Sequence, residues 1–145
     1  MMTGEERKAS VRQILDEVMH KGNFAPIDKF YAANYIGHMS DGTQLNGSEE
    51  LKKFLTMVCS AFPDIQYKVE YMASDGDILA LHASFTGTNT GSMRGMPPTG
   101  KKVAMQEAVF MRFEGDKIVE EWQFINQMAM LQQLGLAPQT PPPGG

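Results

Sequence analysis

The sequence predicts an α+β domain in which three N-terminal helices cover a strongly curved antiparallel sheet, so that the whole forms a cone. Apolar residues recur at helical spacing as far as Phe62 and at a spacing of two from Gln66 onward. Helices followed by a run of strands are typical of α+β domains. The chain has 145 residues, 42% hydrophobic and 21% charged, which is the size and balance of one globular domain.

The first two helices lie before residue 32. Thr3 and Glu6 have the spacing of a capping box and begin a helix that Gly22 ends. Pro26 suits the first turn of a short second helix, which carries Tyr31 on its apolar side.

An extended segment over residues 34–42 separates the second helix from a third. Asn46 or Ser48 caps this third helix, and Pro63 ends it. Its two faces are sharply divided between apolar and charged residues, which indicates packing against a sheet.

Four strands and a short helix complete the domain. We expect the strands at residues 66–71, 78–88, 102–113 and 118–126, and the helix at residues 127–135. The segment 137–145 is rich in proline and glycine and cannot bury apolar surface. We therefore expect one domain over residues 1–136 and a disordered tail.

The register of the last hairpin decides which side chains face the helices. Pairing Phe113 with Ile118 across the tight turn places Val109 opposite Trp122. Because Trp122 is the largest apolar side chain of the hairpin, it gains most from burial. We therefore expect the Trp122 face to look into a pocket.

That choice of face brings polar side chains inward as well, namely Glu107, Glu120 and Asn126. A buried carboxylate is costly unless it is hydrogen-bonded or functional, so these residues are the strongest indication of a site. The alternative is that Glu107 and Glu120 lie at the rim and are solvated. Met105 and Met111 share the same face.

Histidine supplies a second candidate acid or base. His38, in the extended segment, can fold over the mouth of the cone, although a loop histidine is often simply solvated. His82 has the strand position of a structural or outer-face residue. The sequence has no metal-ligand spacing and no phosphate loop that opens a helix, so we expect neither a metal nor a cofactor.

The segment Thr86–Val103 is longer than an ordinary hairpin connection. Its glycines allow sharp turns and its prolines stiffen the return. We expect it to be a lid, with Met93 and Met96 over the pocket; the alternative is a plain strand connection.

Four consecutive stretches carry a family resemblance: "AFPDIQYKVE", "GDILALHASFTGTNTG", "MRGMPPTGKKV" and "FEGDKIVEEWQFINQMAMLQQLG". They resemble the SnoaL-like polyketide cyclases, or ester cyclases, of the nuclear transport factor two-like superfamily, from about Leu15 to Gly135. The resemblance implies a cofactor-free intramolecular aldol cyclisation in which an inward carboxylic acid transfers protons. This fold also hosts other reactions and pure binding domains.

The chain departs from the family pattern at two positions. Asn126 stands where the family usually has Asp, and Asn89 stands where it commonly has His. An amide cannot take up a proton at neutral pH but can donate a hydrogen bond to an oxyanion. Proton transfer would then pass to Glu107 or His38. The expected substrate contacts are Trp122, Met105, Met111, Asn89 and Met96.

Three functions follow as hypotheses. The first is a cofactor-free cyclase or isomerase that acts on a small apolar or aromatic, enolisable substrate. The second is a non-catalytic small-molecule-binding or dimerisation module, which the two asparagines favour. The third is an epoxide hydrolase in which Glu107 and Asn126 hold a water.

The partners and the location of the protein follow from charge and composition. A net charge of -4 without clustered Lys or Arg argues against binding to nucleic acid or a membrane. The N-terminus does not resemble a signal peptide and Cys59 is the single cysteine, so a cytoplasmic location is expected. We also expect a homodimer through the open sheet face, with Phe110, Val119 and Ile125 as contacts.

Overall fold

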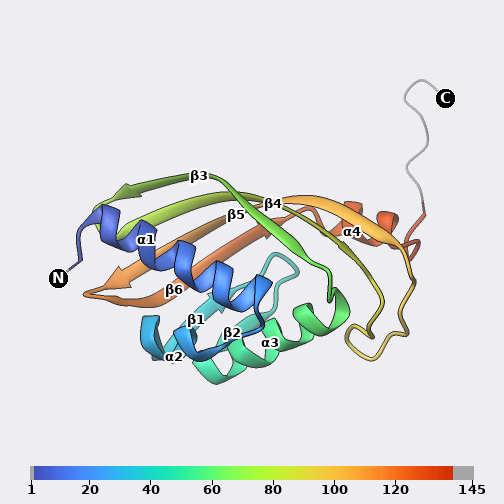
Figure 1. Ribbon diagram of the computed structural model, residues 1–145, viewed down its shortest axis with the longest axis horizontal. Coiled ribbons are helices and arrows are strands. Elements are labelled where there is room, and N and C mark those ends of the chain that lie inside the picture. The colour runs from blue at the N-terminus through green and yellow to red at the C-terminus, as the bar shows by residue number, and fades with distance from the viewer. Residues whose placement is uncertain (1, 139–145) are drawn as a thin grey trace.

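The computed structural model describes residues 2–138 of the chain (Figure 1). Within this range the helices are α1 (Gly4–Leu15), its π-helical continuation η1 (Asp16–His20), α2 (Ala25–Phe30), α3 (Ser48–Ala61) and α4 (Gln127–Gln133). The strands are β1 (Tyr31–His38), β2 (Gln44–Asn46), β3 (Gln66–Asp75), β4 (Ile78–Thr88), β5 (Lys102–Glu114) and β6 (Lys117–Ile125). In the predicted tail, residues 139–145 lie outside the described range.

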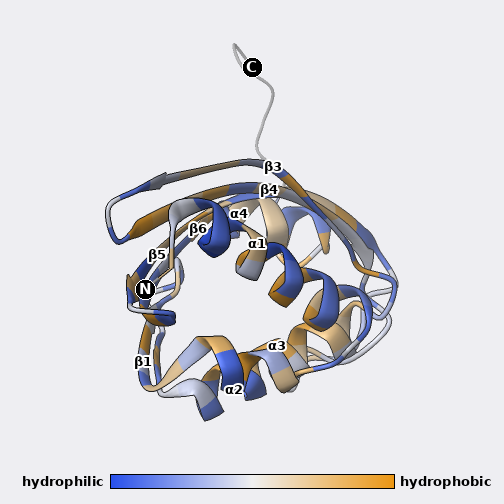
Figure 2. Ribbon diagram, turned by 60° about the vertical axis from the view of Figure 1, so that its left-hand side comes forward, coloured by the Kyte–Doolittle hydropathy of each residue, from blue (hydrophilic) through white to orange (hydrophobic). Residues whose placement is uncertain are grey.

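The strands form one curved, open sheet in the order β2-β1-β6-β5-β4-β3. Figure 2 shows this sheet curling around one side of the molecule, with α1, α2 and α3 on the other. The predicted α+β cone is thus confirmed, with two differences. The sheet has six strands where four were expected, because β1 and β2 are formed before the third helix. In addition, β1 runs parallel to β6, while the other neighbours are antiparallel. No helix in the described part is long and apolar enough to cross a membrane.

The predicted capping residues are present at the start of α1 but not at the start of α3. The Thr3 hydroxyl accepts a hydrogen bond from the Glu6 amide, and the Glu6 carboxylate accepts one from the Thr3 amide, so the predicted capping box is present. In α3 the N-cap is Gly47, and neither Asn46 nor Ser48 caps the helix. Asn46 instead ends β2, where its backbone N–H donates to the Glu50 carboxylate at 2.8 Å.

β1 begins earlier than the sequence pattern indicates. Tyr31 is the first residue of this strand and not part of the second helix. Its backbone pairs with Ile118 of β6, and its ring lies edge-on to Tyr35 at 5.2 Å. Tyr31 therefore belongs to the sheet wall, which the helical spacing around Pro26 did not predict.

A β-bulge at Val119 sets which face of β6 looks inward. Phe113 pairs with Ile118 as predicted, but Arg112 pairs with Glu120, so Val119 is the extra residue. Beyond the bulge Phe110 pairs with Trp122, and both lie on the outer face of the sheet. The predicted inward orientation of Trp122 is therefore wrong, because one inserted residue exchanges the two faces of the strand.

A second bulge, at Glu70, acts on β3 in the same way. Val69 pairs with Ala83 and Tyr71 pairs with His82, so the backbone of Glu70 has no pairing partner in β4. Tyr71 would share the face of Val69 in a regular strand, but here it is 67% exposed on the outer face. Met72 takes the buried position in its place.

Candidate active site

A cavity of about 240 Å³ lies between the inner face of the sheet and the helices. That is more than the roughly 150 Å³ that encloses a benzene molecule in an engineered protein cavity. The walls are mostly apolar and come from α1, η1, α3 and the sheet; they include Val18, Met19, Leu51, Phe54, Leu55, Phe62, Phe85, Val109 and Met111. A ligand in this space would lose most of its contact with water.

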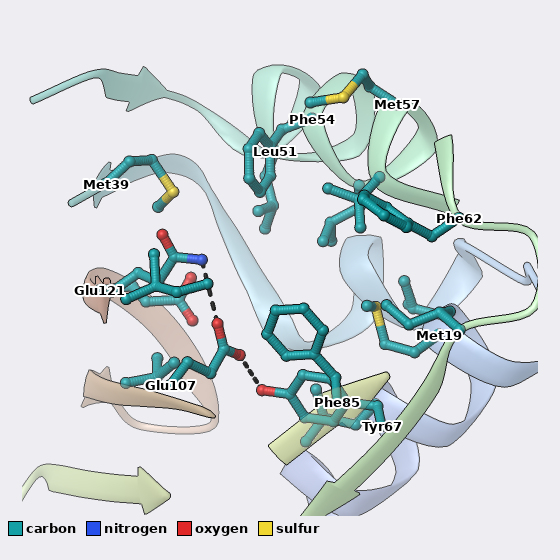
Figure 3. Close-up of a pocket in the computed structure, with 18 of the residues that line it drawn as sticks. Met19, Met39, Leu51, Phe54, Met57, Phe62, Tyr67, Phe85, Glu107 and Glu121 are labelled. Carbon is teal, nitrogen blue, oxygen red and sulfur yellow. Dashed lines mark hydrogen bonds between the residues drawn. The ribbon is translucent and has the colours of Figure 1, made fainter. Parts of the chain in front are cut away.

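Two carboxyl groups face this apolar space from neighbouring strands. Glu107 comes from β5, and the bulge in β6 turns Glu121 and Gln123 toward the same cavity. In Figure 3 the two glutamates lie on one side of the cavity, opposite Phe62 and Met19. The two carboxyls and the Gln123 side chain therefore lie close together on one side of the cavity.

Glu107 is held by two hydrogen-bond donors (Figure 3). The Tyr67 hydroxyl donates to one carboxylate oxygen, and the Gln123 side-chain amide donates to the other at 3.2 Å. Burial raises the pKa of Glu107, and these two hydrogen bonds oppose the rise. They also fix the direction in which the carboxylate points.

Glu121 is more deeply enclosed, with 8% of its surface exposed. The Tyr35 hydroxyl donates to its carboxylate at 2.5 Å. Burial raises the pKa of Glu121 to about 7, the Tyr35 hydrogen bond works against this, and the charge of Glu107 adds to it. Near neutral pH both protonation states of Glu121 are populated, as general acid/base catalysis requires.

Several residues named from the sequence lie on the cavity wall. Glu107, Met96 and Met111 are among its lining residues. Met105 is buried behind the wall, where its sulfur accepts a hydrogen bond from the Gln133 side chain of α4 at 3.3 Å. Met105 therefore supports the wall without forming it.

His38, Trp122 and Glu120 form a separate group on the outer face. The rings of His38 and Trp122 stack at 5.4 Å, and His38 Nε2 lies 2.7 Å from a Glu120 carboxylate oxygen. Arg112 donates to the other oxygen of Glu120 at 3.2 Å. His38 is thus turned away from the cavity, because it pairs with Trp122 on the far side of the bulge.

Asn126 lies at the end of β6 and outside the cavity lining. Its side chain accepts a hydrogen bond from the Ala129 amide at 3.0 Å and so caps α4. A role for Asn126 as oxyanion donor has no support in this geometry, since the residue caps α4 and is not among the residues that line the cavity. The strand ends one residue before it, which the alternating pattern did not predict.

The loop between β4 and β5 borders the cavity with Met93, Arg94 and Met96. Met93 and Met96 exchange two backbone hydrogen bonds across a tight turn, in which Arg94 has a φ of 49° and Gly95 one of 79°. Arg94 reaches across to Asp41 at 2.6 Å, and this ion pair bridges the loop and the β1–β2 turn. Burial disfavours the Asp41 charge, but hydrogen bonds from Thr43 and Arg94 outweigh it and lower the Asp41 pKa to about 2.

Asn89 fixes the base of this loop and is 2% exposed. Its side-chain nitrogen donates to the carbonyls of Ala61 at 3.3 Å and Gly91 at 2.9 Å. Its side-chain oxygen accepts from the amide and the hydroxyl of Thr99. All of these bonds stay within the protein, so the geometry gives Asn89 a structural position and no substrate contact.

The family model described as SnoaL-like polyketide cyclase matches residues 9–134. The chain belongs to this family. The curved open sheet with its covering helices is accordingly the nuclear transport factor two-like cone that the solved structures of the family share. None of the curated proteins compared with this SnoaL-like chain matches it.

Solved structures resemble this family member over almost its whole length. AclR from Streptomyces galilaeus, named as a proposed hydroxylase, is 27% identical, with 96% of this chain and 87% of that chain covered and a TM-score of 0.82. A proposed polyketide cyclase from Acidithiobacillus ferrooxidans is 27% identical, with 95% and 100% covered and a TM-score of 0.78. A SnoaL-like polyketide cyclase from Agrobacterium tumefaciens is 26% identical, with 93% and 100% covered and a TM-score of 0.74.

The sequence pattern of this SnoaL-like protein did not single out Glu121, Gln123 or Tyr67 as site residues. Glu121 and Gln123 were missed because the pattern of apolar and polar residues in β6 does not show the bulge that turns these two side chains inward. Tyr67 was missed because its hydrogen-bond partner Glu107 lies 40 residues away in the sequence. Among the described residues, no group of three or more His, Cys, Asp and Glu side chains could hold a metal ion.

Proposed function

We propose that this SnoaL-like protein is a cofactor-free general acid/base enzyme that closes a ring, or moves a proton, on a small apolar enolisable substrate. The observation that carries the proposal is that two carboxyls, Glu107 and Glu121, face a mostly apolar cavity from neighbouring strands. Family membership supports the same class of reaction.

The two carboxyls have different environments, which suits them to different roles. Glu107 accepts two hydrogen bonds that favour its ionised form, so it is the better base. Glu121 has a pKa of about 7 and holds its proton longer, so it is the better acid.

An aldol ring closure uses both groups. Ionised Glu107 removes a proton from the carbon next to a carbonyl, and the enolate carbon then forms a bond to a second carbonyl carbon of the same molecule. The electron pair of that carbonyl becomes an alkoxide, which takes the proton of Glu121. One proton returns from Glu107 to Glu121 to complete the cycle, so atoms and charges balance.

The rest of the cavity selects the kind of substrate. Methionine side chains are flexible and polarisable and adapt to irregular apolar surfaces. Those on the wall come from helices, sheet and loop; they are Met19, Met39, Met57, Met93, Met96, Met111 and Met130. This lining favours an apolar or aromatic body with its oxygen atoms directed to the side of the glutamates.

The test uses an aryl-substituted 1,5-diketone, whose intramolecular aldol reaction forms a six-membered ring. Glu107→Gln and Glu121→Gln should each lower the rate of ring closure by about 100-fold or more. Glu120→Gln is the matched control, because it changes the neighbouring glutamate on the outer face. Full activity in both inward variants, or an equal loss in the Glu120 variant, would contradict the proposal.

Water addition is a second candidate, because the Gln123 amide stands beside Glu107, where the sequence had suggested Asn126. A carboxylate and an amide together can hold and deprotonate a water. Hydrolysis of styrene oxide by the wild type, lost in Glu107→Gln, with no closure of the diketone, would favour this reaction. Tight binding of both probes without turnover would indicate a non-catalytic module.

A further inference from the structure

Tyr31 is the first residue of β1 and lines the same cavity as the two glutamates. Only 6% of its surface is exposed, and its ring packs edge-on against Tyr35 with an angle of 82° between the planes. The residue is therefore held in the wall by its ring and by the sheet, and its position does not depend on its hydroxyl.

The Tyr31 hydroxyl differs from the two other tyrosine hydroxyls near the carboxyls. The Tyr35 hydroxyl donates to Glu121 and the Tyr67 hydroxyl donates to Glu107. The Tyr31 hydroxyl forms no hydrogen bond within residues 2–138. A hydroxyl that the protein leaves without a hydrogen-bond partner can bond to a group that comes from outside the chain.

The hydroxyl is open to the cavity and not sealed inside the wall. Over the described range, Arg7 Nε is the one side-chain nitrogen or oxygen atom that is both enclosed and without a hydrogen-bond partner. The Tyr31 oxygen has no partner, so it must remain accessible. Since the residue is 6% exposed and lines the cavity, the accessible side of its oxygen is the cavity side.

The electrostatic surroundings keep this hydroxyl in its neutral, donating form. Burial raises the pKa of Tyr31 well above its ordinary value, and the charge of Glu121 adds to the rise. The same Glu121 charge raises the pKa of Tyr35, which places both tyrosines within electrostatic reach of this carboxyl. Tyr31 therefore presents a neutral O–H donor in the wall of the cavity that also holds the proposed acid.

We propose that the Tyr31 hydroxyl donates a hydrogen bond to a carbonyl oxygen of the substrate and thereby holds the neighbouring carbon against the carboxyls. The ligand class is an apolar ketone or ester in preference to a hydrocarbon of the same shape. The hydrogen bond strengthens when the carbonyl becomes an enolate oxygen, since charge develops on the acceptor. This last step rests on the proposed function, whereas the binding of the ketone does not.

The experiment compares two probes that share a skeleton, 1-tetralone with a carbonyl and tetralin without one. Tyr31→Phe removes only the hydroxyl, and Tyr71→Phe is the matched control on the outer face, where Tyr71 is 67% exposed. The dissociation constants are measured by titration calorimetry, with thermal unfolding of each variant to verify its fold. A ¹³C-labelled carbonyl in 1-tetralone gives a second readout, because hydrogen bonding lowers its infrared stretching frequency.

Tyr31→Phe should weaken the binding of 1-tetralone by roughly fivefold to tenfold and leave that of tetralin unchanged. The carbonyl stretch of bound 1-tetralone should move to higher frequency in this variant, while Tyr71→Phe should match the wild type in every measurement. Equal losses for both probes would overturn the proposal in favour of a packing role. Wild-type protein that binds tetralin as tightly as 1-tetralone, or binds neither, would also overturn it.

The two proposals fail in different ways. If Glu107→Gln retains full ring closure but Tyr31→Phe still discriminates between the probes, the proposed reaction is wrong and the ketone site stands. If Glu107→Gln is inactive but Tyr31→Phe binds 1-tetralone like the wild type, the reaction stands and the hydroxyl does not contact the carbonyl.

Discussion

The protonation of Glu121 is coupled to folding, because its carboxyl leaves water when the chain folds. The pKa of Glu121 rises from an ordinary value of 4.5 to about 7 in the folded protein. Between these values the folded protein binds one more proton at this site than the unfolded chain does. Stability from this group is therefore complete below about pH 4.5 and is lost as the pH rises through 7.

Glu121→Gln should flatten this part of the stability profile. The wild type should lose up to about 3 kcal/mol of unfolding free energy, relative to the variant, between about pH 4.5 and pH 7.5. Urea denaturation at intervals across this range measures the difference, and Glu120→Gln serves as control, because that carboxyl lies on the outer face. Parallel profiles for wild type and Glu121→Gln would show that the folded carboxyl is not enclosed.

Glu121 also changes which residue explains a change in reaction rate near neutral pH. A kinetic limb near pH 6.5 would have suggested His38 on the sequence alone, since that is the reference pKa of histidine. In the structure His38 stacks on Trp122 on the outer face. A limb near neutral pH is therefore expected from Glu121, and it should disappear in Glu121→Gln but persist in His38→Gln.

Among the elements, β6 marks the limit of what the sequence pattern could predict. The strand bounds and the pairing of Phe113 with Ile118 followed from alternation and turn chemistry, but the bulge at Val119 did not. Both faces of β6 carry apolar and charged residues, so the pattern fits either register. The size of Trp122 did not identify the inward face of β6, because His38 of β1 covers its ring on the outer face. β1 is distant from β6 in the sequence, so this contact could not be expected.

The loop between β4 and β5 combines a fixed base with a tip that one ion pair tethers. Asn89 ties the base to α3 through the Ala61 carbonyl, whereas Arg94 at the tip binds Asp41 of the β1–β2 turn, and both residues of this ion pair line the cavity. Arg94 is 52% and Asp41 21% exposed as side chains. An ion pair with this exposure contributes about 0.2–1 kcal/mol and weakens with salt, so the tip can open.

Arg94→Gln should let the tip of the loop between β4 and β5 move away from Asp41 more often. Association and dissociation of tetralin should both become about threefold faster, with little change in its dissociation constant, because a salt bridge of this strength changes the opening equilibrium by that factor. NMR exchange spectroscopy measures the two rates. Lys52→Gln is the control, since it breaks ion pairs with Asp28 and Glu49 away from the loop; unchanged rates in Arg94→Gln would exclude Arg94 as a tether.

At the scale of the whole molecule, the sequence predicts the cone-shaped fold, because this fold follows from local patterns of apolar residues. The helical spacing before Phe62 and the strand spacing after Gln66 involve residues that are close in the sequence, so both can be recognised without the structure. The parallel pairing of β1 with β6 joins distant segments and leaves no such signal. For the same reason the cavity could be expected from the sequence, but the identity of its second carboxyl could not.

The outer face of the sheet is the second large surface that the cone creates. Phe110 and Phe124 lie there with rings 6.1 Å apart at 81°, and they are 40% and 55% exposed. Ile125, expected at this surface from the sequence, lines the cavity on the other side. Exposed aromatic residues on one sheet face are typical of protein interfaces, and two copies of one face form a closed dimer.

We expect a homodimer at micromolar concentration that Phe124→Glu separates into monomers. Introducing a charge among these aromatic residues should weaken association by about 30-fold or more, the usual effect of losing an aromatic contact at the centre of an interface. Sedimentation equilibrium measures the change. Met128→Glu is the control, because Met128 is 56% exposed on α4.

Wild-type protein that sediments as a monomer, or a Phe124→Glu variant that remains dimeric, would show that the aromatic face does not join two copies. Since Phe124 points away from the cavity, the variant should still bind 1-tetralone with wild-type affinity, and a loss of that affinity would mean that dimerisation helps to shape the site.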